Sequence, residues 1–99
     1  MVPVMKPKKE ILETSLTVQA PGAMVIYPIR VTFKGKGPTT MEEFRNMDMV
    51  EVMAKAKKVE RGTPTGEFEA VTNKAEMVRL LKVATIKGSK ILEKKVKEG

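Results

Sequence analysis

The stretch NKAEMVRLLKVATIKGSKIL, residues 73–92, decides the fold, because it carries the most regular apolar pattern in the chain. Asn73 stands three residues before Glu76, which is the spacing of a helix N-cap and the glutamate that supports it. The apolar stripe that follows recurs at helical spacing and consists of Met77, Leu80, Leu81, Ala84, Gly88, Ile91 and Leu92. The stretch predicts a last helix packed on one side, with either a close backbone approach at Gly88 or a break at Gly88-Ser89.

A second helix is predicted upstream, ending near residue 48. Thr40 and Glu43 have the Thr-x-x-Glu spacing of a capping box. Met41, Phe44 and Met47 then give a short one-sided apolar stripe that ends there. This region therefore predicts a short helix that packs through one face.

Residues 50–60 show a different pattern from the helices. Val50, Val52, Ala54 and Ala56 alternate with polar residues and with Met53. Alternation favours a third strand that ends near Glu60. A single helix over residues 41–60 is the alternative, because a short apolar run does not separate helix from strand.

Two strands are predicted at the start of the chain, over residues 11–20 and 23–34, joined by a turn at Pro21-Gly22. Pro28 cannot donate a hydrogen bond to a neighbouring strand, so the second strand is expected at a sheet edge or bulged. The inward positions predicted from alternation are Leu12, Thr14, Leu16 and Val18 in the first strand and Val25, Tyr27, Ile29, Val31 and Phe33 in the second.

The remaining strand follows a predicted hairpin tip at residues 61–66. It covers residues 67–72 and is expected to bury Phe68 and Ala70. The fold class is therefore α+β, with the order ββα-ββα: a four-stranded, mostly antiparallel sheet with two helices on one face. Ninety-nine residues make a single domain, predicted over residues 10–99, after a flexible basic arm at residues 1–9 that holds Lys6, Lys8 and Lys9.

The residue inventory argues against an enzyme. The sequence has no cysteine and no histidine, and its serines are Ser15 and Ser89. The absence of cysteine excludes thiol chemistry, and the absence of histidine excludes the commonest general base and the commonest transition-metal ligand. Neither a cofactor nor a metal is expected. No apolar run approaches the ~20 residues of a membrane span, so a cytoplasmic protein is expected. The abundance of lysine and glutamate is typical of thermophilic proteins.

Charge is the most informative feature for function. Nineteen basic and twelve acidic residues give a net charge of +7, with eight basic and three acidic residues in 74–99 alone. This excess predicts a binding domain that contacts the phosphates of DNA or RNA, although a charged surface can also serve solubility alone. The predicted contact residues are Lys55, Lys57 and Arg61 near the third strand, and Arg79, Lys82, Lys90, Lys94 and Lys97 on the outer side of the last helix.

Little sequence specificity is expected of such binding. Lysines outnumber arginines fifteen to four, whereas base readout relies on arginine, asparagine and glutamine. The loop at residues 34–40 leads into a helix N-terminus, a place suited to an anion, but it lacks the Walker spacing and is interpreted as an ordinary connection. The carboxylate pairs Glu42/Glu43 and Glu67/Glu69 are interpreted as surface groups.

An interaction or homo-oligomerising subunit is the alternative function. Its basis is apolar side chains on the predicted outer strand faces, namely Met24, Ile26 and Met53. Methionines adapt readily to interfaces, and an exposed apolar patch is typical of a binding surface. This hypothesis predicts a two-fold homodimer that covers these residues.

Overall fold

The computed structural model describes residues 10–22 and 25–99, which form an α+β fold. The predicted arm at residues 1–9 lies outside the described residues. Within them the elements are β1 (Ile11–Gln19), β2 (Ile29–Lys34), α1 (Met41–Asn46), α2 (Met49–Lys55), β3 (Ala56–Gly62), β4 (Phe68–Ala70), α3 (Lys74–Ala84) and β5 (Lys90–Glu98). The predicted class is confirmed, but the described chain has five strands and three helices rather than four and two.

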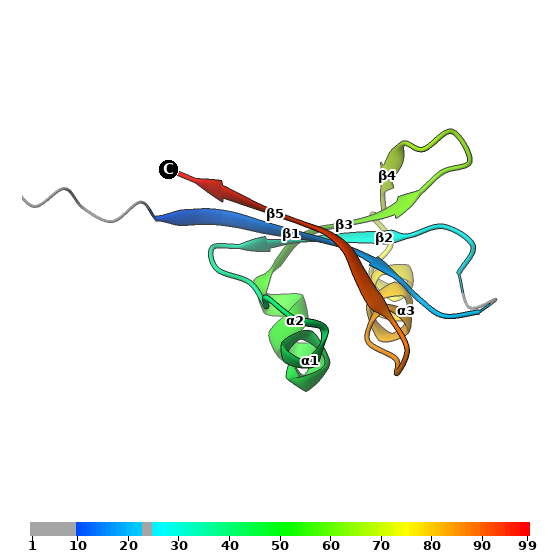
Figure 1. Cartoon of the computed structure of the whole chain (residues 1–99), viewed down its shortest axis with the longest axis horizontal. Coiled ribbons are helices and arrows are strands. Elements are labelled where there is room, and N and C mark those ends of the chain that lie inside the picture. Colours follow the sequence, from blue (N-terminus) through cyan, green and yellow to red (C-terminus); the bar gives the residue numbers. More distant parts are fainter. Residues whose placement is uncertain (1–9, 23–24) are drawn as a thin grey trace, which may run out of the picture.

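The strands form one antiparallel sheet in the order β4-β3-β2-β1-β5. All three helices lie on the same side of this sheet, and the opposite face carries no helix of the described residues (Figure 1). The two-layer arrangement buries one face of the sheet and leaves the other to solvent.

The core lies between the sheet and the helices. The rings of Phe33 on β2 and Phe44 on α1 meet edge to face, with centroids 5.7 Å apart and planes at 89°. This geometry is favoured by the quadrupoles of the two rings. The other buried apolar residues include Leu16, Val18, Ile29, Val31, Val52, Val59, Leu80, Leu81 and Ala84. The predicted inward alternation of β1 and β2 is thus confirmed from Thr14 to Val18 and from Ile29 to Phe33.

Strand β2 is shorter and more central than predicted. It begins at Ile29, so Pro28 stands just before the ladder and its missing N–H costs nothing there. The Pro28 carbonyl accepts a hydrogen bond from the Gly62 N–H at 2.8 Å, which ties the entry of β2 to the end of β3. The prediction of an edge strand, or of a bulge at Pro28, is wrong, since β2 lies between β1 and β3 and its register shift falls at Thr32/Phe33. Tyr27, predicted inward, is 38% exposed.

Residues 49–60 are half helix and half strand. Both sequence hypotheses, a strand throughout and one helix over 41–60, are wrong. The first helix ends at Asn46, and the Asp48 carboxylate accepts a hydrogen bond from the Glu51 N–H at 2.7 Å, which caps α2. Helix α2 buries Val52 and leaves Val50 80% exposed. Strand β3 then begins at Ala56.

The hairpin between β3 and β4 is confirmed at residues 63–67. The Thr63 N–H donates to the Glu67 carbonyl at 2.8 Å. The predicted burial of Phe68 and Ala70 is wrong, because both residues lie on the face of the sheet that no described helix covers. Ala70 is opposite Glu60, and Phe68 is opposite Gly62.

The C-terminal stretch is not one helix. Asn73 caps α3 as predicted, its side chain accepting a hydrogen bond from the Glu76 N–H at 3.2 Å, but the helix ends at Ala84. Gly88 has a φ of +98°, a conformation that favours glycine, and it turns the chain into β5. Ile91, Leu92 and the last lysines therefore lie on a strand beside β1 rather than on the helix.

Candidate nucleic-acid interface

The helix-free face of the sheet is lined by polar side chains that alternate with the core residues. On β1, Leu16 and Val18 point into the core, so Ser15 and Thr17 point outward. On β2, the same alternation turns Arg30, Thr32 and Lys34 outward. We call this helix-free surface the open face, and its charged residues are Glu13, Arg30, Lys34, Lys57, Lys58, Glu60, Lys90, Glu93, Lys95 and Lys97.

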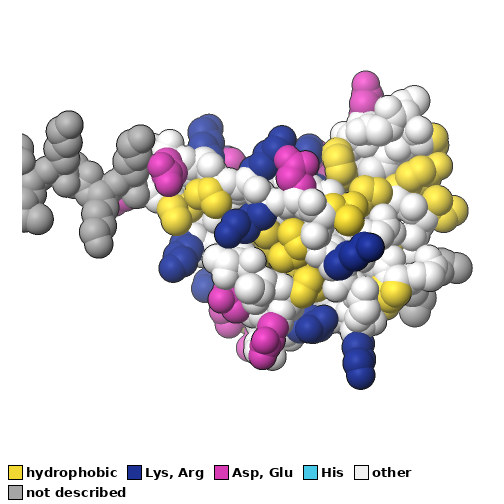
Figure 2. All heavy atoms as spheres, in the orientation of Figure 1, with side chains coloured by type: hydrophobic (Ala, Val, Ile, Leu, Met, Phe, Trp, Pro, Cys, Tyr) yellow, Lys and Arg dark blue, Asp and Glu magenta, His cyan; other side chains and the backbone are white. Residues whose placement is uncertain are grey.

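The open face carries the net charge of the described chain. It holds seven basic and three acidic side chains, whereas the remaining described residues hold nine of each sign. Residues 1–9, outside the described residues, hold three more lysines, and these bring the net charge of the whole sequence to +7. Figure 2 shows Lys and Arg side chains along the upper part of the molecule with acidic side chains among them, and side chains of both signs around the helices below.

Arg30, Glu60 and Phe68 form the most ordered cluster on the open face. The Arg30 Nε and one Nη donate to the two carboxylate oxygens of Glu60 at 2.9 and 3.0 Å. The guanidinium also lies 4.1 Å from the centre of the Phe68 ring, within cation–π range. The hydrogen bonds from Arg30 hold the pKa of the Glu60 carboxyl below its usual range, although burial opposes this. The charge of Arg30 is therefore largely neutralised by Glu60.

The lysines of the open face surround this cluster. Lys58 lies 3.7 Å from the Glu60 carboxylate, and Lys95 lies 3.2 Å from that of Glu93. Lys57 forms an ion pair with Glu13, and its hydrogen bond lowers the pKa of the Glu13 carboxyl. A groove of about 420 Å³ crosses the strands here, and its lining includes Ser15, Thr32, Arg30, Lys58, Lys95 and Lys97 together with the carboxylates of Glu13 and Glu60. Ammonium and hydroxyl groups along one groove can donate hydrogen bonds to a row of phosphate oxygens.

The structure divides the eight predicted contact residues among several surfaces. Lys57, Lys90 and Lys97 lie on the open face. Lys55, at the end of α2, forms an ion pair with Glu51, and Arg61 forms one with Glu76 of α3. Arg79 and Lys82 are on α3, and Lys94 is opposite the core residue Leu16, on the helix side of β5. The prediction that Lys90, Lys94 and Lys97 share a helix with Arg79 and Lys82 is therefore wrong.

Four basic residues of the open face were not among the predicted contact residues. These residues are Arg30, Lys34, Lys58 and Lys95. For Arg30 and Lys34 a signal was present, because they alternate with the buried Ile29, Val31 and Phe33. An outward position on a strand with one buried face predicts a place on the exposed surface of the sheet.

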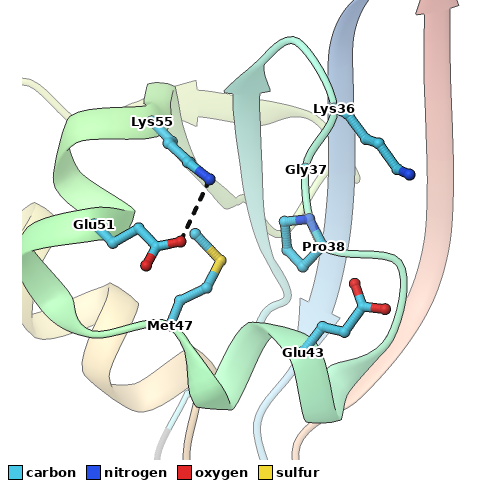
Figure 3. A pocket seen from close by; sticks show the side chains of 7 residues that line it. All are labelled: Lys36, Gly37, Pro38, Glu43, Met47, Glu51 and Lys55. Atoms are coloured by element: carbon cyan, nitrogen blue, oxygen red, sulfur yellow. Dashed lines mark hydrogen bonds and ion pairs between the residues drawn. The ribbon is translucent and has the colours of Figure 1, made fainter.

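The loop before α1 does not offer a free anion site. The Glu43 carboxylate already accepts hydrogen bonds from the Thr39 N–H at 2.9 Å and hydroxyl at 3.0 Å, and these bonds lower the pKa of Glu43. Figure 3 shows this carboxylate at one side of a hollow of about 200 Å³, with the ion pair of Glu51 and Lys55 at the other. The loop fits the interpretation as an ordinary connection.

The apolar patch predicted on outer strand faces does not form there. Met53 lies on α2 and packs against the core, and Met24 falls outside the described residues. Ile26 precedes β2 and is 81% exposed. It lines a separate groove of about 210 Å³ between β2 and α3, together with Val25, Tyr27, Leu80, Arg61 and Arg79.

Comparison of the chain with protein-family models, curated proteins and solved structures gives no match. The described residues contain no group of three aspartates or glutamates placed to hold a metal ion. None of the helices in this part of the chain is long and apolar enough to cross a membrane. The open face is therefore the candidate functional surface, chosen on its charge and geometry.

Proposed function

We propose that the open face binds the phosphate backbone of nucleic acid with little sequence preference, without catalysis. The observation that carries this proposal is the distribution of charge: within the described chain the positive excess lies on one helix-free face. Neutralisation of phosphates and release of their counterions supply most of the sequence-independent affinity of such proteins. A solubilising surface has no reason to gather its excess on one face.

The side chains of the open face favour backbone contacts over base contacts. Apart from Arg30, whose guanidinium is held by Glu60, its basic residues are lysines, which bind phosphate as point charges. Phe68 is the aromatic residue on the described open face, and the Arg30 guanidinium covers its ring. Stacking of unpaired bases is therefore poorly supported, and a duplex is the expected ligand.

The test compares two double variants in salt titrations of duplex DNA binding, followed by fluorescence anisotropy. Lys95→Gln/Lys97→Gln removes two charges from the open face, and Lys74→Gln/Lys82→Gln removes two exposed charges from α3. The first variant should weaken binding to unrelated sequences equally and reduce the salt slope by roughly two, at about 0.9 per phosphate. The control should keep the slope of the wild-type protein.

A wild-type protein that does not bind duplex at low salt would contradict the proposal, since the electrostatic contribution is largest there. Equal losses in the two variants would also contradict it. In either case the second candidate, a protein-interaction subunit, is favoured by the groove between β2 and α3. Ile26 at its rim is 81% exposed, and Arg79 and Arg61 flank its apolar residues.

A further inference from the structure

We propose that β5 pairs antiparallel with β5 of a second copy of this chain, around a two-fold axis at Lys94. Strand β5 is nine residues long and ends the sheet, so in the described structure its outer backbone edge has no neighbouring strand. Unpaired N–H and C=O groups along an edge are a template for another strand. An identical strand is the simplest partner because a two-fold axis satisfies both edges at once.

Symmetry restricts the registers available. The two-fold axis must stand perpendicular to the sheet and pass beside one residue of β5, so that residues equally distant from this residue lie opposite each other. With the axis at Lys94, Glu93 lies opposite Lys95 of the partner subunit, and Lys95 opposite Glu93 of the partner subunit. Within one chain these two side chains are already 3.2 Å apart, so the four charges alternate in sign around the axis.

The same register also pairs the apolar residues of the strand. Leu92 and Val96 are 52% and 42% exposed, although each is a large apolar side chain. Around Lys94 they lie opposite each other across the interface. Directly opposed residues of antiparallel strands contact each other, so this pairing covers apolar surface.

The neighbouring registers place like charges together. An axis at Glu93 opposes the two Glu93 side chains, and an axis at Lys95 opposes the two Lys95 side chains. An axis at Val96 sets Lys95 against Lys97, twice. The Lys94 register also opposes one like-charged pair, Lys94 with itself, but it alone combines the Glu93–Lys95 pairs with the apolar contact of Leu92 and Val96.

Such a dimer would join two open faces into one continuous surface. A two-fold axis perpendicular to the sheet keeps both open faces on the same side, so the basic residues of the two copies lie along one ten-stranded sheet. The pairing does not require nucleic acid. Its test therefore uses the free protein, and it can fail while the proposed function holds.

Charge-reversal variants test the register by light scattering over micromolar to millimolar concentrations. The wild-type chain should reach twice 11.0 kDa. Glu93→Lys and Lys95→Glu should each stay monomeric alone, form a heterodimer when mixed, and dimerise again when combined in one chain. Glu67→Lys, an exposed change in the β3–β4 loop, controls for net charge and should dimerise like the wild-type chain. Dimers of both single variants alone would place the interface elsewhere and overturn the proposal.

A cysteine at the axis provides an independent measurement, because the sequence has no cysteine of its own. Opposed residues of antiparallel strands have Cα atoms about 4.5–5.5 Å apart, within the range of a disulfide. Lys94→Cys should therefore form a disulfide-linked dimer under mild oxidation, and Lys97→Cys, away from the axis, should not. A wild-type chain that stays monomeric at every concentration, together with a Lys94→Cys variant that does not cross-link, overturns the proposal.

Discussion

The guanidinium of Arg30 binds both carboxylate oxygens of Glu60, at 2.9 and 3.0 Å, from the directly opposite position of the neighbouring strand. The Glu60 side chain is 7% exposed, so this carboxylate is nearly removed from water. The same guanidinium covers the ring of Phe68 on the next strand. One arginine thus links β2, β3 and β4 on the face of the sheet that lacks helices.

This geometry predicts unequal effects for the two partners. Arg30→Met leaves the buried Glu60 carboxylate with Lys58 alone, 3.7 Å away, and should lower the free energy of unfolding by about 2 kcal/mol. Glu60→Gln keeps one acceptor for the guanidinium and should cost about 1 kcal/mol. Urea unfolding followed by circular dichroism measures both values. A larger cost for Glu60→Gln would contradict the assignment of Glu60 as the buried partner.

The stability of the domain should fall in acid. The pKa of Glu60 is lowered in the folded protein, first by the hydrogen bonds from Arg30, so the unfolded chain takes up a proton at higher pH than the folded one. The stabilisation is therefore complete above the usual glutamate pKa of about 4.3 and is lost as the pH falls through the lower folded value. Glu60→Gln should flatten this loss in urea midpoints measured from neutral to acid pH. An unchanged acid limb would rule out Glu60 as a contributor.

The helical state of residues 49–55 predicts opposite outcomes at two valines that a strand would place on one face. Val52 is 1% exposed and belongs to the core, whereas Val50 is 80% exposed. Val52→Ser should lower the free energy of unfolding by about 2–3 kcal/mol, and Val50→Ser should change it by less than about 0.5 kcal/mol. Thermal unfolding of both variants decides this. Equal destabilisation would support the strand that the alternating pattern had suggested.

The turn between α3 and β5 depends on Gly88. Its φ is +98°, and a Cβ atom there would lie 3.2 Å from the Pro21 ring. Gly66 has a φ of +87°, but a Cβ atom would meet nothing within 4 Å. Both alanine variants carry the backbone strain of about 1–2 kcal/mol, and Gly88→Ala should cost more because Pro21 must also move. Equal unfolding midpoints for the two variants would show that the contact with Pro21 carries no cost.

Periodicity predicted the elements that bury one face and misassigned those that do not. Strands β1 and β2 alternate because the core takes every second residue, and Asn73 and Thr40 mark their helices by capping. In residues 49–60 the alternation of apolar with polar residues did not indicate a strand throughout, because residues 49–55 are helical. The signal that separates α2 is the spacing of Asp48 and Glu51, which repeats the capping pattern of the other two helices.

Strand β5 could not be found from apolar pattern. It ends the sheet and is almost wholly exposed, so neither face selects apolar residues, and only backbone pairing with β1 defines it. Ile91 and Leu92 happened to continue the helical spacing of α3. The open face was missed for the same reason, because assigning the last lysines to a helix separated them from Arg30 and Lys58, which the sheet brings to the same surface.

The proposed function also predicts a gain of affinity. Glu13 lies on the open face, forms an ion pair with Lys57 and repels phosphate, so Glu13→Gln both frees a cation and removes an anion. A charge a few ångströms from the ligand in water contributes about 1 kcal/mol, which corresponds to roughly fivefold tighter binding. Glu42→Gln on α1, exposed on the helix side, makes the same change of net charge and should have a much smaller effect. Fluorescence anisotropy with duplex DNA at low salt measures both variants. If Glu42→Gln raises the affinity as much as Glu13→Gln, net charge alone governs binding and the open face is not the contact surface.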